Sequence, residues 1–377
     1  MDLWDETGFG IEVFFTTMSL KRFLFLLRCL RFDNIDDRPQ RLETDKFAAF
    51  REVFEIFLAN CERYYIVGEY TTIDEQLVPF RGRCGFLQYL ASKPAKYGIK
   101  VFTLTDARTV YVKAMEVYVG RQADGPYQQS NKPHDIVLRL AKCIENTGRN
   151  ITADNWYSSI PLAEELLTKR TTYVGTLRKN KRELPPEFVN TKNREERSTL
   201  AAFRPKMTLI SYVPRKNKNV ILLSTMHHDA DIDPDTGDLR KPEIISTYNR
   251  TKSGVDTLDE MCGTYSTSRR CRRWPLVLFY RLLDISGING QVVFISNNPQ
   301  SKLMRRLYLR EVGMSLVKPQ IITRLSGTRL PIQLQGSARK IARMEEPNAS
   351  ERTDVTPGCA RCTLPTEKGY EDQEFLC

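Results

Sequence analysis

Apolar residues near the amino terminus recur at helical spacing. Ser19 can cap one such run, whose apolar positions are Leu20, Phe23, Leu24, Leu27 and Leu30. A second run has the same spacing at Phe47, Phe50, Phe54, Phe57, Leu58 and Cys61. Two amphipathic helices so close together predict a small helical segment ahead of the main core.

The period then becomes that of strands. Short β-branched and aromatic runs, separated by turn signals, predict strands at residues 71–80, 99–105, 111–118, 150–153 and 172–177. Ser159-Ile160-Pro161 predicts the start of a helix between the last two strands, because proline is favoured in the first helical turn. The alternation of strand and helix indicates an α/β core.

A polar, mostly basic stretch at residues 178–197 interrupts this alternation and contains Pro185-Pro186, which predicts the entry to an insertion. Strands are expected again at 209–213 and 220–224. After Thr251-Lys252-Ser253-Gly254 the pattern is helical, and residues 274–283 are apolar enough to predict a buried helix. The chain therefore returns to helices after its strand-rich middle.

The length of the chain indicates how many domains it has, and its charge indicates what kind of partner it binds. A chain of 377 residues predicts two or three domains, and a formal charge of +11 favours a polyanionic partner. The segment 302–343, here called the basic arm, has Glu311 as its single acid against Arg305, Arg306, Arg310, Lys318, Arg324, Arg329, Arg339, Lys340 and Arg343. Such a segment is typical of nucleic-acid binding.

Composition argues against several other classes. The apolar runs 23–30 and 275–283 are too short to span a bilayer and contain Arg28 and Arg281, so no membrane contact is expected. The amino terminus lacks a secretory signal, which predicts an intracellular protein with reduced thiols at its nine scattered cysteines. Three histidines leave little material for a histidine-dependent triad.

Three aspartates lie where catalytic carboxylates are usually presented. Asp74 is inside an apolar-flanked strand, Asp154 ends a strand just before a helix, and Asp256 shares a helix face with Asp259. Phosphodiester cleavage can use two hard cations flanked by such carboxylates. Each residue also has a structural explanation: an exposed edge-strand charge for Asp74, a turn or cap for Asp154, and a capping acid for Asp256.

Residues 227–237 suggest a calcium loop, but proline replaces the glycine that this loop requires, so a turn is predicted there.

Several long strings of residues, in order along the chain, closely resemble the piggyBac transposase family. The first are Thr72-Ile73-Asp74-Glu75-Gln76-Leu77, Phe80-Arg81-Gly82-Arg83-Cys84 and Ser92-Lys93-Pro94-Ala95-Lys96-Tyr97-Gly98-Ile99-Lys100. The later ones are Asp154-Asn155-Trp156-Tyr157-Ser158-Ser159-Ile160-Pro161-Leu162-Ala163, Tyr248-Asn249-Arg250-Thr251-Lys252-Ser253-Gly254-Val255-Asp256-Thr257-Leu258-Asp259 and Arg273-Trp274-Pro275. The resemblance extends from about Leu3 to about Arg310.

The resemblance implies an α/β fold with an RNase H-like catalytic core, interrupted by a β-rich insertion and flanked by helical dimerisation and DNA-binding segments. The expected division is 1–69 helical, 70–180 core, 181–243 insertion, 244–266 the core helix of the third aspartate, 267–343 helical and basic, and 344–377 a linker with a cysteine-rich module. It also implies that Asp74, Asp154 and Asp256 are catalytic ligands of Mg²⁺ or Mn²⁺ and that Asp259 is the fourth catalytic acid.

The function implied is cut-and-paste transposition at TTAA sites by a nuclear homodimer acting on double-stranded DNA. A domesticated derivative that binds DNA without cutting is the alternative, and a metal-dependent nuclease unrelated to transposition is a third. The DNA-contacting residues predicted are Arg81, Lys93, Lys96, Lys100, Arg269, Arg270, Arg272, Arg273 and Trp274. A solvated surface would also explain the charges, and a place in the core would explain Trp274.

Both ends depart from the family pattern. The region before Leu3 is shorter than usual, and Cys359 and Cys362 form only half of a zinc site, with Cys377 as one further thiol. We therefore expect a fragment or a decayed or domesticated copy, no stoichiometric structural zinc, and disorder from about residue 345 onward.

Overall fold

A computed structural model describes residues 2–5, 9–91, 93–327 and 330–343. The chain divides into two compact units, one made of residues 1–28 with 314–377 and the other of residues 29–313. Cys359, Cys362 and Cys377 lie outside the described residues, so the zinc prediction and the predicted disorder from residue 345 remain predictions.

The first unit joins the two ends of the chain in a helical cluster. Its elements are η1 (Asp2–Trp4), α1 (Glu12–Thr17), most of α2 (Leu20–Cys29), the last part of α11 (Arg305–Ser326) and α12 (Ile332–Ala342). Val13 packs against a small core of Ile321, Leu330, Ala338 and Ala342. Arg324 donates hydrogen bonds of 2.6 Å to the carbonyl oxygens of Phe15 and Thr16, which ties α11 to α1.

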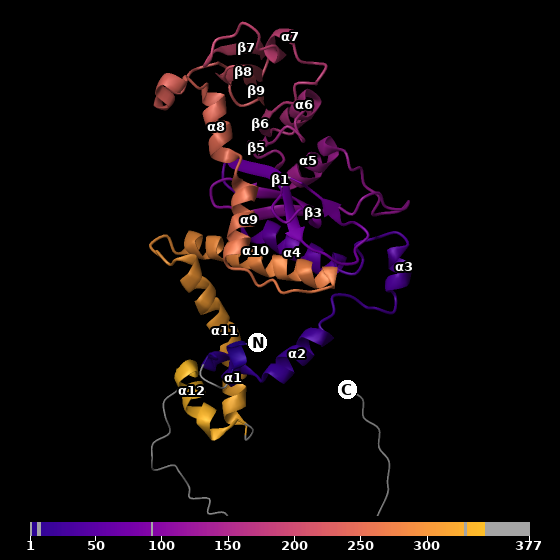
Figure 1. The fold of residues 1–377 in the computed structure, drawn as a ribbon, viewed down its shortest axis with the longest axis vertical. Coiled ribbons are helices and arrows are strands. Elements are labelled where there is room, and N and C mark those ends of the chain that lie inside the picture. The colour runs from indigo at the N-terminus through magenta and orange to yellow at the C-terminus, as the bar shows by residue number, and fades with distance from the viewer. Residues whose placement is uncertain (1, 6–8, 92, 328–329, 344–377) are drawn as a thin grey trace, which may run out of the picture. The chain divides into compact units, whose positions relative to one another are not determined.

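The second unit is built on one mixed sheet (Figure 1). Its strands are β1 (Tyr70–Pro79), β2 (Gln88–Tyr89), β3 (Tyr97–Asp106), β4 (Val112–Val117), β5 (Asn150–Ala153), β6 (Thr172–Thr176), β7 (Thr199–Arg204), β8 (Met207–Arg215) and β9 (Lys218–Ser224). Their order is β2-β3-β1-β5-β6-β9-β8-β7, and β4 also pairs with β3.

The strand directions match the expected core. β3 runs antiparallel to β1, whereas β5 is parallel to β1 and β6 is parallel to β5. This confirms the α/β class with an RNase H-like core. The strands of the insertion do not form a separate sheet, because β9 pairs with β6 and continues the core sheet outward through β8 and β7.

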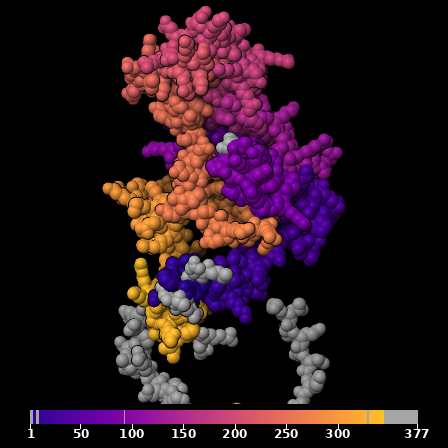
Figure 2. Space-filling view, viewed as in Figure 1, coloured from indigo at the N-terminus to yellow at the C-terminus, as the bar shows by residue number. Residues whose placement is uncertain are grey.

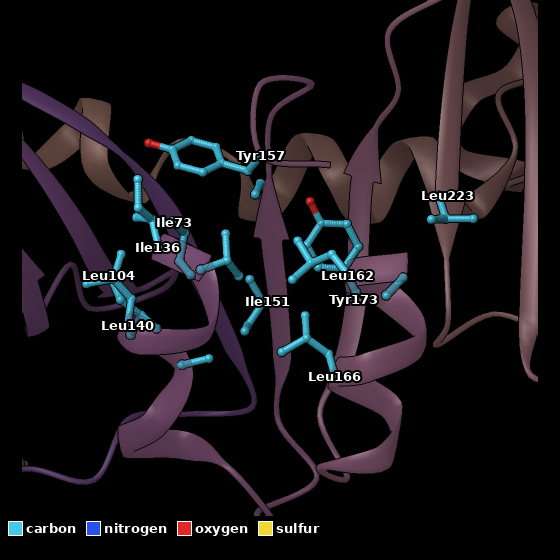
Figure 3. Close-up of a cluster of buried hydrophobic side chains, with 14 of the residues drawn as sticks. Ile73, Leu104, Ile136, Leu140, Ile151, Tyr157, Leu162, Leu166, Tyr173 and Leu223 are labelled. Carbon is cyan, nitrogen blue, oxygen red and sulfur yellow. The ribbon is translucent and has the colours of Figure 1, made fainter. Parts of the chain in front are cut away.

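Helices cover both faces of the core strands. The helices of the whole unit are α3 (Arg38–Leu42), α4 (Arg51–Tyr64), α5 (Pro133–Ala141), η2 (Lys142–Ile144), α6 (Ile160–Thr168), α7 (Pro186–Val189), η3 (Pro234–Leu239), α8 (Glu243–Thr251), α9 (Gly254–Thr264) and α10 (Trp274–Asn297). On one face, side chains of α5 and α6 such as Ile136 and Leu162 pack with Ile73 and Ile151 (Figure 3). On the other, α4, α9 and α10 supply Phe54, Leu258 and Leu278, among others.

Most predicted elements are confirmed, and the errors have physical causes. The helix expected from Phe47 begins at Arg51, because the Asp45 carboxylate accepts a hydrogen bond from the Phe47 N–H and holds a turn there. Helix α10 continues to Asn297, beyond the predicted end at residue 283, because its polar residues have buried partners. Asn289, for example, bonds both the N–H and the carbonyl of Val112. The patterns of β2, β7, α5, α7 and α8 were missed, and the turn expected at residues 227–237 contains the start of η3.

Helix α10 is long and apolar enough, by length and composition alone, to cross a membrane. The core helix of a globular unit passes the same test, and α10 packs against α4, α9 and β1. Its role in this structure is therefore that of a core helix. The six cysteines of the described residues are free thiols.

Candidate active site

Two of the predicted aspartates lie side by side on neighbouring strands. The parallel register of β1 and β5 pairs Ile73 with Ala153. Asp74 directly follows Ile73, and Asp154 directly follows Ala153. Asp154 follows the last residue of β5, whereas Asp74 lies within β1. Sheet pairing alone therefore brings two carboxylates together from positions 80 residues apart in the chain.

The other two aspartates are on α9, which is attached to the strands by threonines. Thr72 donates a hydrogen bond to the carbonyl of Thr251, and the hydroxyls of Thr152 and Thr251 are 2.8 Å apart. Thr72 and Thr152 each lie two residues before a strand aspartate, on the same face of the sheet. We call Thr72, Thr152 and Thr251 the threonine latch. Thr251 is the last residue of α8, so the latch holds the short segment that leads from α8 into α9 against the strands of Asp74 and Asp154.

Gly254 allows this close approach. A Cβ atom at residue 254 would lie 2.5 Å from the Thr105 hydroxyl and 2.7 Å from the Thr72 hydroxyl. Any larger residue would thus push α9 away from β1 and β3. Asp256 and Asp259 follow on the same helix, so their distance from the strand aspartates depends on Gly254.

Burial and repulsion by neighbouring carboxylates raise the pKa values of Asp74, Asp154 and Asp259. Burial, together with the charges of Glu75 and Asp154, raises the pKa of Asp74 to about 7. Burial also raises the pKa of Asp154 and of Asp259. A cluster of desolvated carboxylates of this kind is unfavourable unless positive charge compensates it.

Two protein cations reach the acids on α9. The Lys93 ammonium is 3.3 Å from Oδ1 of Asp256, and the Arg281 guanidinium is 3.4 Å from Oδ1 of Asp259. Asp74 and Asp154 form no ion pair with any of the described residues; their carboxylates accept backbone N–H groups from Glu75 and Trp156, respectively. The compensation is therefore uneven, because the cations that reach the acids on α9 make no ion pair with the strand aspartates.

A cleft of about 1000 Å³ opens beside α9. Asp256 and Asp259 line it together with four residues predicted to contact DNA: Arg81, Lys93, Arg269 and Arg270. In the space-filling view, the orange surface of α9 borders the purple surface of the earlier strand segments (Figure 2). The structure thus brings four predicted phosphate contacts and the two acids of α9 to one cleft, whereas Asp74 and Asp154 are not among the residues that line it.

The remaining predicted contacts lie elsewhere. Lys96 is exposed at the turn between β2 and β3. The Lys100 ammonium is 3.8 Å from Oε2 of Glu75 and lies over the rings of Phe102 and Trp156. With 12% of its side chain exposed, Lys100 is engaged by protein groups rather than directed at solvent.

Arg272, Arg273 and Trp274 line a second cavity of about 590 Å³. The Trp274 ring stacks on Phe47 at a centroid distance of 5.7 Å and meets the edge of Phe86 at 5.1 Å. Arg273 donates to the carbonyl of Leu30. Trp274 therefore contributes to the core next to α4, which is the structural explanation considered for it from the sequence.

The acids suit a hard divalent cation in chemistry. Within the described residues, no three histidine, cysteine, aspartate or glutamate side chains converge closely enough to hold a metal ion. Carboxylate oxygens are nevertheless the ligands that Mg²⁺ and Mn²⁺ prefer, and two buried acids without an ion pair present uncompensated negative charge. Asp74 and Asp154 are the adjacent pair that would hold such an ion, and Asp256 and Asp259 are the acids on α9 that would have to come closer to complete the ligand set.

Sequence reasoning missed several residues that shape this site. Arg281 could have been found, because a charge on an otherwise apolar helix needs a buried partner. Thr72 and Thr152 could have been found from strand alternation, since residues two apart share a face. No local signal marks Gly254 or the pairing of Lys93 with Asp256.

Known proteins share both sequence and fold with this chain. The family model described as Transposase IS4 matches residues 1–291. Two human proteins are each 24% identical over 270 residues, or 66% of this chain: piggyBac transposable element-derived protein 3 and the chimeric ERCC6-PGBD3 protein. The match covers 45% of the first and 25% of the second, so the chain spans less than half the length of these relatives.

A solved structure is similar over nearly the whole chain. It is a piggyBac transposase in a synaptic complex with hairpin DNA, determined by cryo-EM. The TM-score is 0.85 with 38% sequence identity, and the similarity covers 95% of this chain and 74% of the other. The similarity therefore includes both the sheet and the helices around it.

Proposed function

Because the chain belongs to the Transposase IS4 family and is homologous to piggyBac-derived proteins, we propose that it is a metal-dependent DNA transposase of the piggyBac type. Its reaction would be strand cleavage followed by strand transfer at TTAA sites, on double-stranded DNA, as a homodimer in the nucleus. The observation that carries the proposal is the pairing of Asp74 with Asp154 under a helix that presents Asp256 and Asp259.

Each residue of the site has a part in this proposal. Asp74, Asp154 and Asp256 would hold the cation, and Arg281 keeps Asp259 oriented on the same helix as Asp256. When bound, Mg²⁺ or Mn²⁺ would activate the attacking oxygen and stabilise the leaving oxygen of the phosphodiester. The threonine latch keeps the helix acids in register with the strand acids, and Arg81, Arg269 and Arg270 bind the DNA backbone along the cleft.

A second candidate function is DNA binding without cutting. It is favoured by the similarity to a human protein that is named as derived from a transposable element. The two functions share a fold and a basic surface, and they differ in whether the acids perform chemistry.

Strand nicking on a TTAA-flanked duplex separates them. The chain is expected to nick this DNA in Mg²⁺ or Mn²⁺, and Asp154→Asn should reduce nicking by about 100-fold or more, because removing a metal-binding charge costs several kcal/mol of transition-state stabilisation. Asp124→Asn, in a loop away from the cleft, is the matched control and should cut normally. DNA binding without nicking by the unmodified chain would favour the second function.

A further inference from the structure

We propose that Lys93 is a positioning residue that serves as the resident counter-cation of the aspartate cluster and thereby sets the affinity of that cluster for divalent cations. The proposal rests on the proposed function, since it assumes that the cluster binds metal. It gives Lys93 a role distinct from that of a simple phosphate contact.

The position of Lys93 is set by a tight turn between β2 and β3. The N–H of Leu90 donates to the carbonyl of Lys96 at 2.8 Å, and the N–H of Lys93 donates to the carbonyl of Leu90 at 3.2 Å. From this turn the Lys93 side chain, 18% exposed, reaches to 3.3 Å from Asp256, 163 residues later in the chain. Few lysines give up so much solvent without a partner.

The Lys93 ammonium lies among the acids of α9. It is 3.3 Å from Oδ1 of Asp256, and Lys93, Asp256 and Asp259 line the same cleft. This ammonium therefore supplies positive charge to carboxylates that a bound cation would also use.

A lysine and a divalent cation cannot occupy this place together without strong repulsion. Lys93 would therefore have to withdraw from Asp256 for a cation to bind there. Lys93 also lines the cleft next to Arg81 and Arg269, so its ammonium would then lie nearer the predicted path of the DNA backbone. A bound cation would then strengthen the binding of DNA, because it frees Lys93 to contact the backbone. Since coupling between two ligands is reciprocal, bound DNA should strengthen the binding of the cation equally.

The test is a Mn²⁺ titration of the full chain without DNA, followed by the electron paramagnetic resonance of free Mn²⁺. Lys93→Met removes the ammonium and keeps the length of the side chain, and it should bind Mn²⁺ about tenfold more tightly than the unmodified chain because a nearby like charge is gone. Lys93→Arg keeps the charge and should retain the unmodified affinity. Lys96→Met is the matched control, since it removes one exposed charge from the same turn, and its affinity should change by less than about twofold.

A second titration measures duplex DNA affinity with and without Mn²⁺. The ion should tighten DNA binding by the unmodified chain, and this coupling should shrink in Lys93→Met. Equal or weaker Mn²⁺ binding by Lys93→Met would overturn the proposal while leaving the metal site intact. Absence of Mn²⁺ binding in every variant would instead remove both this proposal and the proposed function.

Discussion

Replacing Gly254 by alanine tests whether the approach of α9 to the sheet positions the acids. The new Cβ atom would lie 2.5 Å from the Thr105 hydroxyl and 2.7 Å from the Thr72 hydroxyl, both far inside van der Waals contact. Thr72 cannot easily turn away, because its χ1 is stiff and its hydroxyl bonds the Thr251 carbonyl. The start of α9 must move instead.

The cost follows from two opposing effects. Overpacking of a tight interface costs about 1–3 kcal/mol, while alanine is better than glycine in a helix by at most about 1 kcal/mol. Gly254→Ala should therefore lower the free energy of unfolding by about 1–2 kcal/mol. Gly263, on the same helix, is exposed, and a methyl group there would meet nothing within 4 Å, so Gly263→Ala should raise the free energy of unfolding by up to about 1 kcal/mol.

Urea unfolding measures the free energy of unfolding, and a Mn²⁺ titration measures the affinity of the site. Gly254→Ala should also weaken Mn²⁺ binding, because Asp256 lies two residues further along the displaced helix, whereas Gly263→Ala should leave it unchanged. If Gly254→Ala were as stable as the unmodified chain and bound Mn²⁺ equally well, the contact of α9 with Thr72 and Thr105 would not control the site.

Two further predictions concern charge and packing. The pKa of Asp74 is raised to about 7 from an ordinary value of 3.8, so the folded chain retains a proton that the unfolded chain has lost. The stability that this group contributes is present below about pH 4 and is lost as the pH rises through about 7. Urea unfolding without metal should show the free energy of unfolding fall over this pH range. Asp74→Asn should make the free energy of unfolding depend less on pH over the same range. Trp274→Ala should cost about 3 kcal/mol of unfolding free energy without DNA, because the ring packs on Phe47 and Phe86. Arg272→Ala is its control, and unchanged stability of Trp274→Ala would favour a base-stacking role instead.

Local periodicity predicted the elements that carry the acids, and the resemblance to the piggyBac family singled the acids out. Strand alternation identified the segments that became β1 and β5, and with them Asp74 and Asp154. Helical spacing placed Asp256 and Asp259 on one face of α9. These inferences succeed because the direction of the side chains repeats every few residues in a helix or a strand, so the sequence of a short segment carries the pattern.

The tertiary structure alone decided which distant groups meet at those acids. Thr72 reaches Thr251 across 179 residues of chain, and Lys93 reaches Asp256 across 163. Such pairs depend on how α9 docks on the sheet and on where the turn after β2 ends, and no period in the sequence encodes either. The burial that raises the pKa of Asp74, and the ammonium that opposes this rise, therefore became visible only once the strands and helices were packed together.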